Sequence, residues 1–187
     1  MIIGLTGKNG AGKGEAANFL QSIGFQYYSL SDVVREEVAA RGLPVTRDNL
    51  VVVANELRNN FGPSVLAKRI LQKLKPEQNY VIDSIRNPAE IEALRTRADF
   101  TLLAIIADPK TRFERMKARA RENDPQTFEG FLAAEAREAE NKDPNAQQLN
   151  RTEALADTQV PNNGLMAELH LALRRVLAEL GTQKENL

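Results

Sequence analysis

The segment Gly7-Lys8-Asn9-Gly10-Ala11-Gly12-Lys13 has the residue types and spacing of a loop that binds phosphate groups. It directly follows the apolar run Ile2–Thr6 and precedes a stretch with helical periodicity. Glycines at such a turn let successive backbone N–H groups converge on phosphate oxygens, and the N-terminus of the following helix adds positive potential. In the G-x-x-x-x-G-K pattern the lysine reaches the β- and γ-phosphates of a nucleoside triphosphate. The segment therefore predicts an ATP site in which Lys13 stabilises the transferring phosphoryl group.

Candidate metal ligands are two carboxylates, because the hydroxyl residue that commonly follows the lysine is replaced by Gly14. Mg²⁺ keeps several waters and is usually held by one or two carboxylates together with substrate phosphates. Glu15 follows the loop, and Asp83 ends the apolar run Tyr80–Ile82. Each has a structural alternative, since an acid is favoured in the first turn of a helix and aspartate is common in turns.

An arginine-rich segment with helical character supplies candidate ligands for further negative charge. Arg115 and Arg119 are four residues apart and so share one face of the predicted helix. Like charges at this spacing repel unless an anion lies between them, and phosphoryl transfer supplies that anion. A solvated face balanced by Glu114 and Glu122 is the alternative interpretation.

Short apolar runs alternate with helical segments along the chain, which predicts an α/β fold with a parallel sheet covered on both faces. The predicted strands lie near residues 2–6, 27–28, 80–83, 100–107 and 158–160. We expect one domain over residues 1–187, with an acceptor-binding helical insertion at about 32–75 and a lid-like helical region at about 109–145. The polar stretch 141–151 is predicted to be a loop, and the tail from Gly181 is predicted to fray.

Composition narrows the possible partners. The 25 basic and 25 acidic side chains cancel, which gives no support to nonspecific binding of nucleic acid or of a membrane surface. No cysteine is present, so disulfides and thiolate metal sites are excluded. No secretory signal and no long apolar run is found, and we expect a cytoplasmic protein that is a monomer or a homodimer.

These motifs resemble those of the P-loop nucleoside monophosphate kinase superfamily. Residues 7–14 match the adenylate-kinase-type pattern G-x-x-G-x-G-K-G, and Glu15 stands where those kinases have threonine. Ser29–Arg35 resembles their S-T-G-D-x-x-R segment, with Leu30 in place of the threonine, and Asp83–Arg86 is similar to their D-G-x-x-R element. The resemblance implies a three-layer P-loop kinase fold, with a five-stranded parallel sheet in the order 2-3-1-4-5 and with ATP and Mg²⁺ as ligands.

The resemblance also implies roles for individual residues. It assigns catalysis to Lys13, Arg86, Arg119 and Arg121, the last within a segment that looks like the family's lid-closing R-x-D-D. It assigns metal binding to Asp83 and Glu15. It places the acceptor on Ser29, Asp32, Arg35 and Arg86. It implies nucleotide contacts from Gly7, Lys8, Asn9, Gly10, Ala11, Gly12, Lys13, Gly14, Glu15, Arg115 and Asn162.

Three functions remain open, and the first is a kinase whose acceptor is a nucleoside or deoxynucleoside monophosphate. The second is a dephospho-CoA kinase, because Ala156-Asp157 and Asn162-Asn163-Gly164 resemble that enzyme's A-D and N-x-G segments. That enzyme has D-A-D where this chain has Ser29-Leu30-Ser31, and a sugar hydroxyl needs a base that a monophosphate does not. The third is a nucleotide-binding regulatory module with little kinase activity. The sequence therefore favours a small-molecule nucleotide acceptor.

Overall fold

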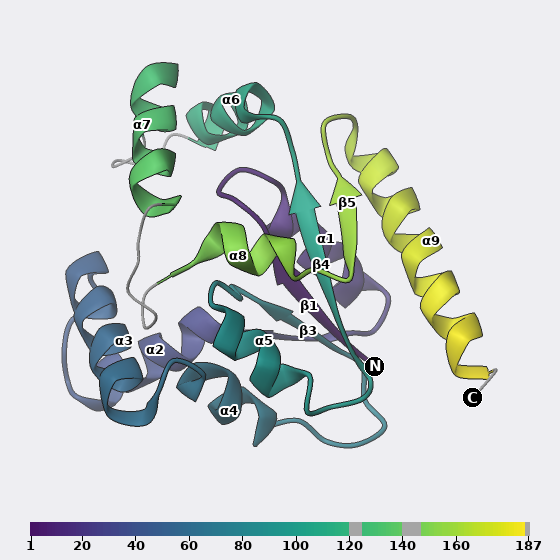
Figure 1. Ribbon diagram of the computed structural model, residues 1–187, viewed down its shortest axis with the longest axis horizontal. Coiled ribbons are helices and arrows are strands. Elements are labelled where there is room, and N and C mark those ends of the chain that lie inside the picture. The colour runs from purple at the N-terminus through teal and green to yellow at the C-terminus, as the bar shows by residue number, and fades with distance from the viewer. Residues whose placement is uncertain (120–124, 140–146, 186–187) are drawn as a thin grey trace.

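A single five-stranded parallel sheet forms the centre of the protein (Figure 1). The structure is a computed structural model that describes residues 1–119, 125–139 and 147–185. The sheet has the order β2-β3-β1-β4-β5, so both the predicted fold class and the predicted strand order are confirmed. The strands are β1 (Ile2–Thr6), β2 (Gln26–Ser29), β3 (Tyr80–Asp83), β4 (Phe100–Ile106) and β5 (Thr158–Pro161).

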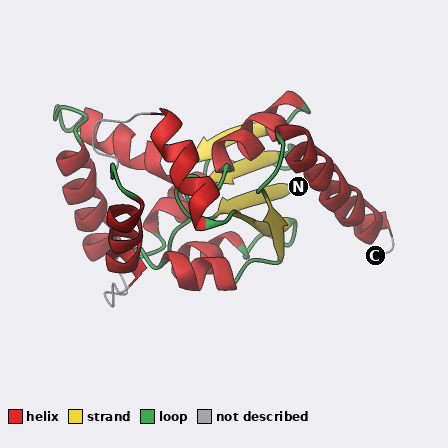
Figure 2. Cartoon of the chain, turned by 90° about the horizontal axis from the view of Figure 1, so that it is seen from above, coloured by secondary structure: helices red, strands yellow, loops and turns green. Residues whose placement is uncertain are grey.

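Helices cover both faces of this sheet and make the three-layer P-loop kinase fold (Figure 2). Alternate residues of the strands enter two separate hydrophobic cores, so that Ile2 lies in one core and Ile3 in the other. One face packs against α1 (Lys13–Ser22) and α9 (Met166–Glu185). The other packs against α2 (Leu30–Ala40), α3 (Arg47–Phe61), α4 (Val65–Leu71) and α5 (Pro88–Leu94).

The helices α6 (Pro109–Arg119) and α7 (Phe128–Ala139) form a small unit of their own beside the sheet. Three buried side chains, Phe113, Met116 and Phe131, make a third hydrophobic core there, with Phe128 packed against it. The predicted lid-like region therefore contains two helices joined through the non-helical residues 125–127, and residues 120–124 and 140–146 lie outside the described residues.

The helix α8 (Leu149–Ala154) corrects the predicted loop at residues 149–151, while residues 147–148 are non-helical as predicted and residues 141–146 lie outside the described residues. It contacts α5, α7 and β1, and Gln148 N donates a hydrogen bond to Arg86 O at 2.8 Å. Six residues make fewer than two helical turns, too short for the periodicity that identifies an amphipathic helix. Tertiary contacts therefore determine this helix, which lies across the carboxyl end of β1 (Figure 1).

The helix α9 corrects the prediction that the chain frays from Gly181, because it continues to Glu185. A glycine inside a helix costs only about 1 kcal/mol relative to alanine, and the preceding turns are fixed by the buried residues Leu169 and Leu173. No helix within the described part of the chain combines the length and the apolar character needed to cross a membrane.

The packing of α3 gives a stability prediction with a control in the neighbouring residue. Val53 is 1% exposed, whereas Val52 is 53% exposed on the same helix. We expect Val53→Ala to lower the free energy of unfolding by about 2 kcal/mol, because two buried methyl groups are lost and a cavity remains. Val52→Ala should change it by less than about 0.5 kcal/mol. Urea unfolding of both variants measures the difference, and equal values would contradict the packing of α3.

Candidate active site

The loop between β1 and α1 has the backbone geometry of a phosphate cradle. Gly7 and Gly12 have φ values of 136° and 105°, a region that favours glycine. A Cβ atom would collide with the carbonyl oxygen of Ile105 at Gly7 and with the side chain of Asn162 at Gly12. Because α1 begins at Lys13, the loop runs directly into a helix N-terminus. The residues present therefore fit a bound polyphosphate.

Lys13 is folded back over this loop. Its Nζ donates hydrogen bonds to the carbonyl oxygens of Gly7 at 2.6 Å and Lys8 at 3.1 Å. Burial, together with the positive charges of Arg86 and Arg119, lowers the pKa of Lys13 to about 8 against the opposing effect of Asp83 and Glu153. The structure thus brings together three of the four predicted catalytic residues. The fourth, Arg121, lies outside the described residues.

Arg115 and Asn162 meet at the phosphate loop, although they are far apart in the sequence. Arg115 Nη1 donates to Asn162 O at 2.9 Å, and Asn162 Nδ2 donates to Ala11 O at 2.7 Å. The side chain of Asn162 is buried against Gly12. Both predicted nucleotide contacts are therefore anchored to the loop itself.

A buried ion pair fixes the backbone at Arg86. The carboxylate of Glu90 in α5 is fully buried and accepts the backbone N–H groups of Arg86 at 2.9 Å and Asn87 at 3.1 Å. Arg58 of α3 donates to the same carboxylate at 3.4 Å. Burial raises the pKa of Glu90, and the charge of Arg58 opposes that rise. The Arg86 side chain extends to Gln147, with its Nη1 donating to Oε1 at 2.9 Å.

The predicted acceptor residues at the end of β2 form one polar cluster. Arg35 Nη1 donates to Asp32 Oδ1 at 2.6 Å and to Ser31 Oγ at 3.0 Å. Ser29 Oγ lies 2.7 Å from Ser31 Oγ and donates to Ser84 Oγ at 3.1 Å. Ser84 has a φ value of 66°, which is uncommon for a residue other than glycine and marks backbone strain of the kind found at functional sites.

The two predicted metal ligands have different surroundings. Asp83 lies at the carboxyl end of β3, where Oδ1 accepts the Ser84 N–H at 2.6 Å and Oδ2 accepts the Tyr27 hydroxyl at 3.4 Å. The Glu15 carboxylate instead faces α9, where its Oε1 lies 3.0 Å from Nε2 of His170. Within residues 1–119, 125–139 and 147–185, no group of three or more His, Cys, Asp or Glu could hold a metal ion. Asp83 alone therefore fits a water-mediated Mg²⁺ contact beside substrate phosphates.

Glu153 is a site residue that sequence reasoning missed. It lies on α8, near enough to the phosphate loop for the charges of Lys8 and Lys13 to act on its carboxylate. Burial raises the pKa of Glu153, while Lys8, Lys13 and Arg112 oppose that rise with their positive charges. No sequence signal pointed to it, because α8 is too short for a recognisable period.

Arg112 is a second residue whose place the sequence did not show. It is buried, and its Nε donates to Ala107 O at 2.9 Å. Its two terminal nitrogens both donate to the Glu135 carboxylate of α7. Since Arg112 Nη1 also reaches Asn9 O at 3.4 Å, this arginine connects the phosphate loop to α7.

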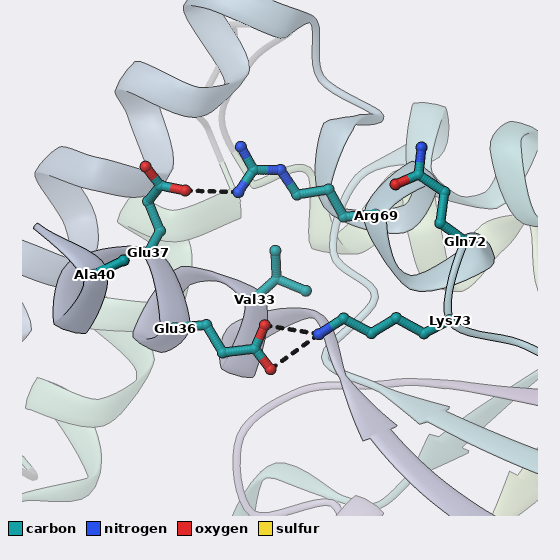
Figure 3. Close-up of a pocket in the computed structure, with 7 residues that line it drawn as sticks. All are labelled: Val33, Glu36, Glu37, Ala40, Arg69, Gln72 and Lys73. Carbon is teal, nitrogen blue, oxygen red and sulfur yellow. Dashed lines mark hydrogen bonds and ion pairs between the residues drawn. The ribbon is translucent and has the colours of Figure 1, made fainter.

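A pocket between α2 and α4 is separate from these residues (Figure 3). Its four charged side chains pair with one another: Lys73 Nζ lies 2.6 Å from Glu36 Oε2, and Arg69 Nη1 donates to Glu37 Oε2 at 2.7 Å. Because these charges are already balanced, the pocket offers a ligand little uncompensated charge. The phosphate loop is the better candidate site.

Two sequence comparisons identify the family to which the chain belongs. Residues 3–143 match the AAA domain family. The UPF0200 protein of Thermococcus kodakarensis is 33% identical over 187 residues, which cover 96% of this chain and 98% of that protein.

Solved structures share the fold. The protein TT1252 from Thermus thermophilus has a TM-score of 0.62 at 24% identity, with 96% of this chain and 97% of that chain covered. Shikimate kinase from Bacteroides thetaiotaomicron has a TM-score of 0.61 at 15% identity, with 97% and 98% covered. The chain therefore belongs to the UPF0200 family, and its AAA domain has the three-layer P-loop kinase fold.

Proposed function

We propose that this protein is an ATP-dependent phosphotransferase whose acceptor is the phosphate of a nucleoside or deoxynucleoside monophosphate. The observation that carries the proposal is that Arg86, from the loop after β3, and Arg119, from α6, act electrostatically on Lys13 at the start of α1. Their mutual repulsion contributes to the lowered pKa of Lys13. Such a concentration of positive charge is unfavourable in the free protein and becomes favourable when phosphate groups are bound.

Each cation has a role in the proposed transfer. Lys13, at the start of α1, follows the charge that develops between the β- and γ-phosphates. Arg119, at the end of α6, stabilises the transferring phosphoryl group from the opposite side. Arg86 and Arg35 bind the acceptor phosphate and orient its oxygen for in-line attack, because an anionic nucleophile needs positioning more than activation.

Mg²⁺, when bound through water to Asp83 and to the phosphates, would neutralise part of the charge on the leaving ADP. The chain's own residues would position the nucleotide and exclude water from the site. Asn162 and Arg115 are anchored to the carbonyl oxygen of Ala11 and border the nucleotide side of the loop. The α6–α7 unit would exclude water from the transferring group, since an open site would hydrolyse ATP instead.

The acceptor-side carboxylates favour a phosphate over a hydroxyl acceptor. A hydroxyl acceptor, as in the dephospho-CoA kinase alternative, needs a base to remove its proton. Asp32 is paired with Arg35 at 2.6 Å, and Asp83 accepts hydrogen bonds from Ser84 and Tyr27. Both carboxylates are therefore engaged, while Arg86 is hydrogen-bonded to the uncharged side chain of Gln147 and keeps the charge that an acceptor phosphate requires.

Turnover of ATP to ADP with Mg²⁺ tests the proposal against a panel of acceptors. The panel contains ribo- and deoxynucleoside monophosphates, dephospho-CoA and shikimate. We expect one monophosphate to stimulate turnover, and Lys13→Ala to reduce it by at least about a hundredfold, because a donor to the transferring group is lost. Lys73→Ala is the matched control, since it removes the same charge from the pocket between α2 and α4.

The other outcomes of this assay are equally informative. Stimulation by dephospho-CoA or shikimate alone would retain the phosphotransferase and reject the monophosphate acceptor. ATP binding without stimulation by any acceptor would support the regulatory module instead. Equal losses for Lys13→Ala and Lys73→Ala would reject the loop as the reacting site.

ATP affinity should depend on pH through Lys13. The pKa of this lysine is about 8, below its ordinary value, so the ammonium is charged below pH 8 and loses its proton above it. Bound phosphates favour the charged form, so binding above pH 8 requires proton uptake and the Kd should rise by up to about tenfold per pH unit. Calorimetric titration between about pH 7.5 and about pH 9.5 measures this.

Lys13→Arg is the control for this pH dependence. A guanidinium remains charged over the whole range, so any ATP affinity that the variant retains should not change with pH. A Kd of the unaltered protein that stays constant up to pH 9.5 would contradict the contact between Lys13 and the phosphates.

A further inference from the structure

One oxygen of the Glu90 carboxylate holds the backbone at Arg86. Glu90 Oε2 accepts the backbone N–H of Arg86 at 2.9 Å and that of Asn87 at 3.1 Å, the second as part of the capping box that begins α5. The Glu90 side chain is 0% exposed, so bulk water does not compete for these contacts. The direction in which the Arg86 side chain leaves the backbone therefore depends on Glu90.

The other oxygen of the same carboxylate joins this backbone to α3. Glu90 Oε1 accepts a hydrogen bond from Arg58 Nη2 at 3.4 Å. Arg58 is 7% exposed and belongs to the helix that packs against α2 and α4. These three helices make up the insertion that we expect to bind the acceptor. Through Glu90, the backbone of Arg86 is thus tied to the acceptor-binding helices.

Packing alone gives a poor account of the pair between Arg58 and Glu90. Taking two charges out of water costs free energy that their attraction often fails to repay, and a neutral replacement of a buried pair is frequently as stable. Among the residues that the structure describes, Arg58 Nε is buried and has no hydrogen-bond partner. A buried donor without a partner adds a further cost. The position that the pair gives to Arg86 explains its presence better than the stability that it adds.

We infer that Glu90 and Arg58 are positioning residues for the acceptor phosphate, on which they act through Arg86. The inference rests on the proposed function, in which Arg86 binds that phosphate. A binding group has to be held within about 0.5 Å of its productive geometry by the residues around it. Gln147 contacts the guanidinium of Arg86 and Gln148 N contacts its carbonyl oxygen, so Glu90 completes the set by holding its N–H.

The double variant Arg58→Met/Glu90→Gln tests the inference in the full chain. The glutamine oxygen can keep both backbone N–H contacts, and both charges of the pair are removed together. We expect the variant to unfold at the same urea concentration as the unaltered protein or at a higher one, because no buried charge is left unpaired. Its KM for the monophosphate should rise about tenfold, because Arg86 is no longer held to α3.

Other kinetic constants distinguish positioning from general damage. The kcat at saturating acceptor and the Kd for ATP should each change by less than about threefold, because the interaction lost is one with the bound acceptor. Arg58→Lys keeps a charge opposite Glu90 Oε1, so its acceptor KM should stay within about threefold of the unaltered value. Raised KM values that accompany equal losses of ATP affinity would overturn the inference.

Arg86→Ala identifies the route of the effect. In this background Arg58→Met/Glu90→Gln should raise the acceptor KM by less than about twofold, because the group that the pair positions is absent. An equal rise in both backgrounds would show that the pair acts on the acceptor by another route and would reject the inference. Lys73→Met/Glu36→Gln is the matched control, since it neutralises a pair between α2 and α4 and should leave the KM unchanged.

Failure of the proposed function gives a different result. If no monophosphate stimulates turnover of the unaltered protein, the acceptor site is rejected, and the inference with it. If the unaltered protein and Arg58→Met/Glu90→Gln share one measurable acceptor KM, only the inference is rejected. A double variant that loses stability and keeps that KM would make the pair purely structural.

Discussion

Parallel pairing of β1 with β3 on one side and β4 on the other is the constraint on which the site depends. Parallel strands end at a common edge, so the phosphate loop after β1, Asp83 at the end of β3 and Asn162 after β5 all lie there. The loop after β3 brings Arg86 to the same edge, and the helix α6 after β4 brings Arg115 there. A mutation that shifted the register of β1 would displace all of these groups at once. Most surface mutations would displace only one of them.

Nearby carboxylates offset only part of the positive charge at this edge in the free protein. The lowered pKa of Lys13 reflects burial and two neighbouring arginines, and Asp83 and Glu153 oppose it. Two further ion pairs lie around the site and hold their helices to it: Arg58 with Glu90, which is buried, and Arg112 with Glu135, which is partly buried. Removing one partner of a buried pair leaves an uncompensated charge, so these pairs make the positions of α3 and α7 relative to the site well defined.

Local sequence determined the phosphate loop, the strands and most helices, because glycine spacing and apolar runs report directly on backbone conformation and burial. The meeting of Arg115 with Asn162 followed only from a family resemblance, since 47 residues separate them. Glu153 could not be predicted, because α8 takes its shape from contacts with α5, α7 and β1. The direction of Glu15 could not be predicted either, because packing of α9 against α1 decides it.

The contact between α1 and α9 has a practical consequence. The chain contains one histidine and no tryptophan. That histidine, His170, stacks on Phe19 with ring centroids 4.6 Å apart and bonds to Glu15, two residues after Lys13. Its two carbon-bound imidazole protons, Hδ2 and Hε1, would each give one ring-current-shifted resonance from a position directly behind the phosphate loop. The fold thus contains a native magnetic resonance reporter for events at that loop, with no label introduced.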